Sequence, residues 1–408
     1  MGLVARTLDI LQAKRDKAIA GGVNCIPSPL KRFRDDFPGV EQETYYIVTA
    51  TQKGAKTQFS SYLFLYNSIM FAYNHPELIR VKIFYVNLEE SEDRIMMRFM
   101  SFLLFTGKCG KVRLSPAALR SIKEDEPLPQ EIIDMLRDEE PFKSVLKFFE
   151  DHVEFIDSKN PTGIYKTIRT YSATHGKDVM TDYEAVDKTT GEIKHVKKFD
   201  HYEPDDPDEY VIIYTDHISK LTNEVHDGIR SNLRETIQKY SDYMMEVRDK
   251  YKYIPVVIQQ QSTETQNLDA FKNNKIRPTA AGLADNKATG RDANYIFGLT
   301  NPSYFEIPEY CGYDITRLRD SARFLELIAG REGTANNVVG LYFDGAVCYF
   351  NELPKPTDTN KLNEVYATVR DRNRVTEESE HIGQKKPVRA GFLAVTLKSI
   401  KEFVSGIQ

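Results

Sequence analysis

Residues 50–57, which read ATQKGAKT, have the types and spacing of a loop that binds phosphate groups. They follow a short β-type run, YYIV, and precede a segment suited to a helix. In that geometry backbone N–H groups and the helix N-terminus face the anion, a lysine reaches the outer phosphates, and a threonine hydroxyl can hold Mg²⁺. The usual pattern is G-x-x-x-x-G-K-[ST], and here Ala50 and Ala55 occupy its two glycine positions. A solvated loop that contains Lys56 and Thr57 by chance is the competing interpretation.

The ends of three downstream strands carry side chains that suit the same chemistry. Glu89 follows VKIFYVNL, Asp216 follows YVIIYT, and Gln261 follows IPVVIQQ. Strand ends of this kind converge on a nucleotide in a parallel α/β sheet. The aspartate would hold Mg²⁺, the glutamate would polarise the attacking water, and the glutamine would report the γ-phosphate. Each residue alone is more often a solvated strand cap, so the order and spacing of all four elements carry the interpretation.

The overall composition limits the classes of protein to which the chain can belong. Its 408 residues, 41% of them hydrophobic, suit one large α/β domain or two smaller ones. The net charge of −5 means that nucleic-acid contact must come from local basic patches. No uncharged apolar run approaches membrane-spanning length, which predicts a protein without membrane contact. The four cysteines, Cys25, Cys109, Cys311 and Cys348, are scattered, as expected of reduced thiols in the cytoplasm.

Alternating strand and helix signals predict the scaffold that must position these residues. Strands are expected at residues 45–48, 81–88, 154–157, 210–215, 254–259 and 295–299, with helices between most of them. This alternation predicts a mostly parallel sheet covered by helices on both faces. A β-hairpin insertion is expected at residues 177–208, and a further hairpin turn at Asp344-Gly345.

Two terminal segments flank the predicted core of residues 23–353. Residues 1–22 form an amphipathic linker helix that stops at Gly21-Gly22, and its apolar stripe needs either this domain or a neighbouring subunit for burial. Residues 354–408 are expected to form a polar linker, disordered to about residue 389, and an amphipathic tail. The tail would either pack on the domain or dock a partner.

These segments together resemble the C-terminal RecA-like motor domain of DnaB-type replicative helicases. YIVTATQKGAKT is similar to the phosphate loop of that family, IFYVNLEESEDRIMMRFMS to the segment with its catalytic glutamate, and VIIYTDHISKL to its Walker-B strand. IPVVIQQQS is similar to its glutamine strand and KIRPTAAGLADNKATGRDANYIFGL to its DNA-loop segment. ELIAGREGTANNVVGLYF resembles its terminal strands, which act on a neighbour's nucleotide. The resemblance spans residues 2–353 without the hairpin insertion.

The resemblance implies an α/β fold of the RecA-like P-loop NTPase type, with ATP and Mg²⁺ as cofactors. Lys56 would bind the β/γ-phosphates, Thr57 and Asp216 would hold the Mg²⁺, and Glu89 would activate water. Gln261 would couple hydrolysis to the DNA loops, and Arg331 would act on the adjacent subunit's nucleotide. The other implied nucleotide-binding residues are Ala50, Thr51, Gln52, Lys53, Gly54 and Ala55. The expected DNA contacts are Lys272, Lys275, Arg277, Lys287 and Arg291, with Arg230 as the next candidate.

Three positions depart from the family pattern. Ala55 replaces the glycine before the lysine, so that a methyl group must fit where the backbone approaches phosphate, and Gly54 would restore flexibility. Ala329 stands where the family has a lysine, and Ala284 where its DNA-loop segment has an arginine. We expect these changes to affect turnover more than nucleotide binding. The family's N-terminal primase-docking domain is not expected, because only the helix of residues 2–20 precedes the motor.

The expected protein is an ATP-dependent hexameric helicase that translocates on single-stranded DNA in replication. It would act in the cytoplasm, that of the host if it is phage-encoded, and its tail would bind a replisome partner. Two alternatives stay open. A RecA-type ATPase would share the fold but form filaments on DNA, and a low-turnover nucleotide-binding scaffold would account for Ala55 and Ala329.

Overall fold

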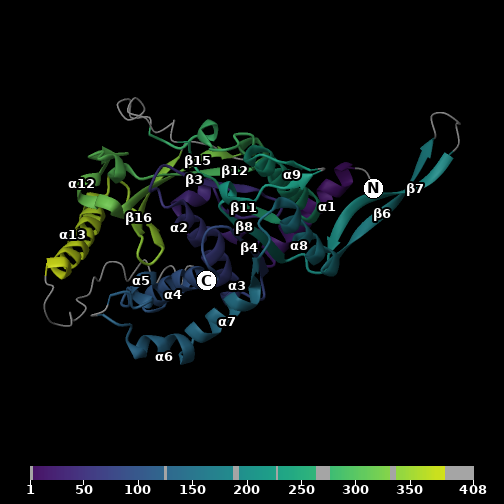
Figure 1. Ribbon diagram of the computed structural model, residues 1–408. Coiled ribbons are helices and arrows are strands. Elements are labelled where there is room, and N and C mark those ends of the chain that lie inside the picture. The colour runs from purple at the N-terminus through teal and green to yellow at the C-terminus, as the bar shows by residue number, and fades with distance from the viewer. Residues whose placement is uncertain are drawn as a thin grey trace.

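The structure of the chain, a computed structural model, describes residues 3–123, 126–186, 193–226, 228–262, 276–330 and 337–381. Its centre is a nine-stranded sheet (Figure 1). In spatial order the strands are β17 (Tyr349–Glu352), β16 (Val338–Asp344), β15 (Ala322–Gly330), β12 (Tyr295–Thr300), β3 (Tyr46–Ala50), β11 (Ile254–Ile258), β8 (Glu209–Asp216), β4 (Arg80–Asn87) and β5 (Val153–Ile156). Neighbours from β12 to β5 are parallel, whereas β15, β16 and β17 pair antiparallel. The predicted mostly parallel sheet is confirmed.

Helices cover both faces of this sheet, which explains why its central strands are apolar throughout. Every residue of β3, β11 and β12 is buried. One face packs against α2 (Lys56–Ser60), α3 (Asn67–Asn74), α4 (Glu92–Gly107), α6 (Gln130–Asp138) and α7 (Phe142–His152). The other face packs against α8 (Pro161–Thr174) and α9 (Leu233–Tyr251). Asn160 caps α8 by accepting a hydrogen bond from the Gly163 N–H at 2.8 Å.

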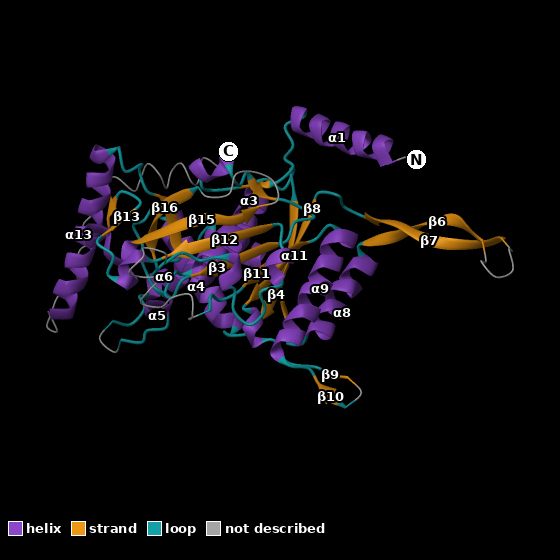
Figure 2. Ribbon diagram, turned by 90° about the horizontal axis from the view of Figure 1, so that it is seen from above, coloured by secondary structure: helices purple, strands orange, loops and turns teal. Residues whose placement is uncertain are grey.

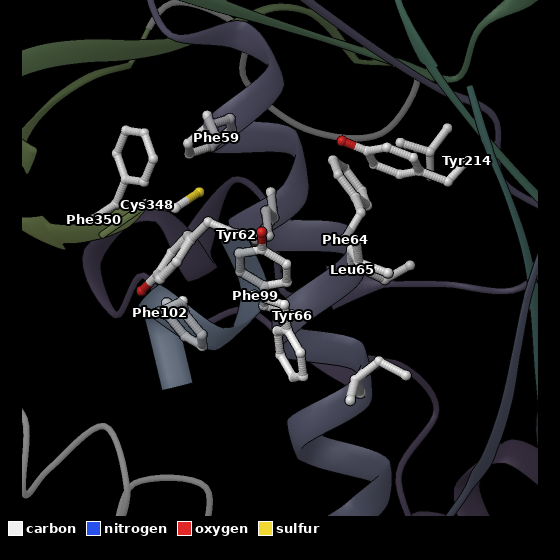
Figure 3. Close-up of a cluster of buried hydrophobic side chains, with 14 of the residues drawn as sticks. Phe59, Tyr62, Phe64, Leu65, Tyr66, Phe99, Phe102, Tyr214, Cys348 and Phe350 are labelled. Carbon is white, nitrogen blue, oxygen red and sulfur yellow. The ribbon is translucent and has the colours of Figure 1, made fainter. Parts of the chain in front are cut away.

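The helix after the predicted phosphate loop is continuous from Lys56 to Asn74, because a π-helical stretch, Ser61–Tyr66, joins α2 to α3. Its aromatic side chains enter the cluster of Figure 3. Phe59 meets Phe350 of β17 at a ring-centroid distance of 5.4 Å, and Tyr66 meets Phe102 of α4 at 4.9 Å. Each buried aromatic ring contributes about 1.5–3 kcal/mol. The loop is thereby attached to a rigid base.

Two elements project from the body at the same end of the molecule (Figure 2). The predicted hairpin is a long ribbon of β6 (Gly176–Val186) and β7 (Ile193–Pro204), whose turn lies outside the described residues. The predicted N-terminal helix is α1 (Leu3–Ile19), and its side chains from Val4 to Asp16 are exposed. No helix in the described part of the chain has the length and apolar character that a membrane span requires.

The segment after β17 differs from the disordered linker expected there. Residues Thr359–His381 form a long helix, α13. Leu362, Tyr366 and Val369 on this helix are buried against Phe324 of β15 and Leu353. The polar composition of this segment suggested disorder because three apolar residues spaced four and three apart are a narrow stripe, and such a stripe suffices for a helix that packs along one edge.

The remaining elements are short and connect the parts described above. They are β1 (Ile26–Pro27), β2 (Gly39–Val40), α5 (Pro116–Leu119), β9 (Val225–His226), β10 (Ile229–Arg230), α11 (Thr289–Asp292), β13 (Glu309–Tyr310), β14 (Tyr313–Asp314) and α12 (Ile315–Leu318). All four cysteines are free thiols.

Candidate nucleotide-binding site

The carboxyl ends of β3, β11, β8 and β4, which are neighbours in the sheet, open into one cavity of about 640 Å³. The predicted loop and three predicted strand-end residues all line it. The lining residues are Ala50, Thr51, Gln52, Lys53, Gly54, Ala55, Lys56, Thr57, Gln58, Glu89, Glu90, Arg98, Asp216, Gln260, Gln261, Asp320, Arg323, Phe343 and Gly345. The structure therefore brings together the residues that the sequence assigned to nucleotide binding, to Mg²⁺ and to water activation.

The loop has the backbone conformation of an anion-binding turn even though it lacks the usual glycine. Ala55 is the N-cap of α2 and adopts a left-handed conformation, with φ of 65° and ψ of 35°. Gly54 has no positive φ. A Cβ atom at Gly54 would lie 2.7 Å from the Cβ of Ala50 and 3.0 Å from the Leu299 carbonyl oxygen. The glycine therefore allows close packing, and Ala55 itself takes the strained conformation.

Asp216 and Thr57 meet at the start of α2. The Thr57 hydroxyl donates a hydrogen bond to Asp216 Oδ1 at 3.2 Å. Asp216 is buried, and this desolvation raises the pKa of its carboxyl to about 6, although the nearby Lys56 and the Thr57 hydrogen bond act in the opposite direction. Among the described residues, no group of three His, Cys, Asp or Glu side chains could hold a metal ion.

These oxygen atoms fit Mg²⁺. The ion commonly takes one or two protein oxygens and completes its shell with phosphate and water. Burial leaves the Asp216 carboxylate short of solvation, so that a cation there would be favoured. Thr57 and Asp216 would hold the ion.

Glu89 lies at the end of β4 with half of its side chain exposed to the cavity side, at 51% of its full area. The Nε2 atom of His217 lies 3.3 Å from Glu89 Oε2 and 3.3 Å from the side-chain nitrogen of Gln260. His217 is buried, and this burial lowers the pKa of its imidazole. Sequence reasoning missed His217 and Gln260, although each is the immediate neighbour of a residue that it selected.

Gln261 is buried and its amide is fully engaged. Its Nε2 donates to the Thr49 hydroxyl at 3.0 Å and to the Thr279 carbonyl at 3.1 Å, and its Oε1 accepts from the Thr279 N–H at 3.2 Å. The residue thus ties β3 to the far side of the segment predicted to contact DNA. The side chain of Gln260, in contrast, is exposed at the cavity.

Two arginines at the cavity were not among the predicted residues. Arg98 on α4 forms an ion pair with Glu90, the residue after Glu89. Arg323 on β15 is buried over the Phe343 ring, with its Nη atoms bonded to residues 320 and 322 and its Nε atom without a partner among the described residues. Desolvation lowers the pKa of Arg323. Arg98 stands in the quoted second-strand segment, whereas no sequence pattern marks Arg323.

The predicted DNA contacts fall into separate places. Arg277 donates from Nε to the Tyr310 hydroxyl at 3.2 Å and lies 3.7 Å from Glu326. Lys287 and Arg291 are exposed beside α11, and Arg230 is exposed on the small β9–β10 hairpin, which projects from the body (Figure 2). Lys272 and Lys275 lie outside the described residues, as does Arg331.

A larger cavity, of about 720 Å³, lies away from this chemistry, at the root of α1 and the start of α13. Its lining mixes apolar and charged side chains, among them Phe71, Leu353, Arg32 and Glu352, and two of these are already paired, since Arg32 binds Glu352 at 3.4 Å. Size alone does not make it the nucleotide site, because it contains none of the loop and strand-end residues.

Comparison with known proteins supports the fold. No family model matches the chain, and no curated protein is found as a relative. Among solved structures, the ATPase domain of a DnaB-like helicase is similar over 87% of this chain and 100% of its own, with a TM-score of 0.57 and 12% identity. A DnaB-like replicative helicase, described with its interactions with primase, is similar over 86% of this chain and 67% of its own, with a TM-score of 0.54 and 13% identity. The chain therefore has the RecA-like fold of the ATPase domains of DnaB-like helicases.

Proposed function

We propose that the chain is an ATP-hydrolysing motor that works as a hexameric helicase on single-stranded DNA during replication, in the cytoplasm. The observation that carries this proposal is the contact between Thr57 and Asp216 at 3.2 Å, beside Lys56 and in one cavity with Glu89. A lysine, a hydroxyl and an aspartate on adjacent strand ends are the parts that hold a nucleoside triphosphate and its metal. The shared fold with DnaB-like ATPase domains supports the same assignment.

Each side chain has a task in this mechanism. Lys56, at the start of α2, would bind the β/γ-phosphates, together with the first N–H groups of the helix. Mg²⁺, when bound, would neutralise charge that develops on the phosphate oxygens. Glu89 would orient and polarise the attacking water, which its half-exposed position permits. Arg98 fixes Glu90 and so stabilises the turn that carries Glu89.

Assembly into a ring would complete the site. Arg331 would reach the nucleotide of the adjacent subunit, because it follows β15, which ends at Gly330. The helix α1 would bind a neighbouring subunit, because Val4 is 72% exposed and Leu8 59% exposed in the single chain. The C-terminal tail would bind another component of the replication machinery.

DNA would contact the loops that follow the nucleotide-binding strands. Gln261 ties this region to β3, so that a change at the phosphates would move it. Six copies of Lys272, Lys275, Arg277, Lys287 and Arg291 would surround a channel with positive charge, even though each chain has a net charge of −5. Arg230 would add a contact from the β9–β10 hairpin.

The test is the hydrolysis of ATP by Glu89→Gln. We expect this variant to bind ATP as the wild type does but to hydrolyse it ~10²-fold or more slowly. Glu92→Gln is the matched control, since Glu92 is an exposed residue of the first turn of α4, and it should keep full activity. Wild-type turnover in Glu89→Gln would remove Glu89 from the mechanism. An inactive wild-type protein would favour the nucleotide-binding scaffold.

The oligomeric form separates the helicase from the RecA-type alternative, which shares the fold. Electron microscopy with a slowly hydrolysed ATP analogue and forked DNA should show closed rings. Open filaments on DNA would select the RecA-type ATPase instead.

A further inference from the structure

The imidazole of His217 meets two side chains of the cavity through a single nitrogen atom. Its Nε2 lies 3.3 Å from Glu89 Oε2 and 3.3 Å from Gln260 Nε2. The other ring nitrogen, Nδ1, is buried and has no hydrogen-bond partner in the described part of the chain. Only 2% of the residue is exposed. The polar interactions of this ring therefore converge on Nε2.

One nitrogen cannot satisfy both neighbours in the same way. A neutral imidazole nitrogen carries either a proton or a lone pair. With the proton on Nε2, the ring donates to the Glu89 carboxylate. With the proton on Nδ1, the ring accepts at Nε2 from the amide N–H of Gln260. Because Nδ1 has no partner among the described residues, the contact made at Nε2 decides which form is present.

The positions of the two partners give this choice a consequence. Glu89 ends β4 and is the residue assigned to water activation, whereas Gln260 follows β11 and lines the cavity beside the phosphate loop. The next residue, Gln261, is bound to Thr49 and Thr279 and does not reach His217. Gln260 is thus the glutamine whose side chain can leave His217 for a bound phosphate.

We propose that His217 is a positioning residue that holds Glu89 through Nε2–H, and that Gln260 competes for the same nitrogen. When Gln260 turns to the outer phosphate of a bound nucleotide, Nε2 becomes available to Glu89, and the carboxylate is fixed for water activation only while the triphosphate is present. This inference rests on the proposed ATPase activity. His217 transfers no proton to the substrate in this scheme and acts through Glu89.

The experiment compares His217→Leu with His217→Gln. Leucine fills the space without a polar atom, while the amide nitrogen of glutamine can reach the place of Nε2. We expect His217→Leu to lower kcat by about 10- to 100-fold, as for residues that orient a metal ligand, and to leave the dissociation constant of ATP within about twofold. His217→Gln should recover most of the rate. A merely structural histidine would instead lower thermal stability and nucleotide affinity in both variants.

Double substitutions test the route. In a Glu89→Gln background, His217→Leu should cause no further loss, because the group that it positions is already disabled. Gln260→Leu should change kcat in the wild-type background but not in the His217→Leu background. Multiplicative losses in either pair would overturn the inference. An inactive wild-type enzyme would instead defeat the proposed function, whereas an active wild type with an equally active His217→Leu variant would defeat this inference alone.

Discussion

The nucleotide cavity and the two projecting elements are opposite in construction. At the cavity, each functional side chain is held by partners from other strands, as Gln261 is by Thr49 and Thr279 and Asp216 is by Thr57. At the projecting end, α1 and the β6–β7 ribbon expose apolar side chains such as Leu8 and Phe199, which are 59% and 39% exposed. The first region is complete within one chain as a binding site, whereas the second would gain stability from a partner.

This difference shows where the chain depends on itself and where it would depend on another molecule. The α1 helix is tied to the body near its end by an ion pair between Lys17 and Asp208, and both side chains are about one-third exposed. A pair of this kind contributes about 0–1 kcal/mol. The base of the ribbon is better attached, since Tyr202 is buried and Lys250 pairs with Asp178 at 2.8 Å. Substitutions at the cavity should therefore affect chemistry, and substitutions at the projections should affect assembly.

The largest expected effect is the loss of nucleotide binding in Lys56→Ala. The cavity would lose the cation at the start of α2, and truncating one partner of a desolvated charge pair costs about 2–5 kcal/mol, which corresponds to at least ~30-fold in affinity. Titration with a fluorescent ATP analogue measures it. Lys53→Ala is the control, because Lys53 lines the same cavity but is exposed. Equal losses in the two variants would mean that general charge, and not the position of Lys56, binds the nucleotide.

The second effect concerns assembly. Removal of residues 1–20 should convert rings to monomers, while the free energy of unfolding of the monomer changes by less than about 1 kcal/mol, since α1 buries little in the single chain. Mass measurement in solution determines the first result and urea denaturation the second. Leu11→Ser should weaken the ring and Lys14→Ser should not, because only Leu11 belongs to the apolar stripe. A truncated protein that remains hexameric would show that α1 is not the contact.

A smaller effect is expected for DNA, and the structure sharpens the choice of residue. Lys287 is exposed and forms no ion pair with any described residue, whereas Arg277 already contacts Tyr310 and Glu326. Lys287→Ala should therefore weaken single-strand binding more than Arg277→Ala, and should reduce the slope of log affinity against log salt by about 1. Fluorescence anisotropy at several salt concentrations measures both quantities. If neither variant changes the slope, the β9–β10 hairpin with Arg230 becomes the leading candidate.

The sequence predicted the parts of the molecule that follow from local patterns. The alternation of apolar strands and helices was sufficient for the sheet, and strand ends with Glu89, Asp216 and Gln261 were sufficient to find the cavity. The His217 contact escaped prediction because it depends on how β8, β4 and β11 lie side by side, which no spacing along the chain expresses. Arg323 escaped for the same reason, since it reaches the cavity from the antiparallel part of the sheet.

The helix α13 was missed for a different physical reason. Its segment is rich in charged residues, and only a narrow apolar stripe packs on the body. Composition registers the average of such a segment, whereas the fold uses the few residues that make contact. The left-handed conformation of Ala55 was likewise beyond prediction, because the sequence showed a missing glycine but not which residue would take its conformation.

The smallest expected effect tests that strained position. A left-handed L-residue costs about 1–2 kcal/mol, and glycine loses about 0.5–1 kcal/mol through the greater freedom of its unfolded chain. Ala55→Gly should therefore raise the free energy of unfolding by about 0.5–1 kcal/mol, measured by urea denaturation. Because the methyl group lies where the backbone meets phosphate, the same change should also tighten ATP binding.

Two further substitutions separate the causes. Lys252, the C-cap of α9, has a similar φ of 60° far from the cavity, so that Lys252→Gly should give a comparable gain in stability without any change in ATP affinity. Gly54→Ala should act in the opposite direction, by about 1–3 kcal/mol, because its Cβ atom would lie 2.7 Å from that of Ala50. If Ala55→Gly proves neutral while Lys252→Gly stabilises, the loop would be held by its packing on β3 and β12 strongly enough that the strain at Ala55 has no effect, and the lost glycine would have no consequence for the motor.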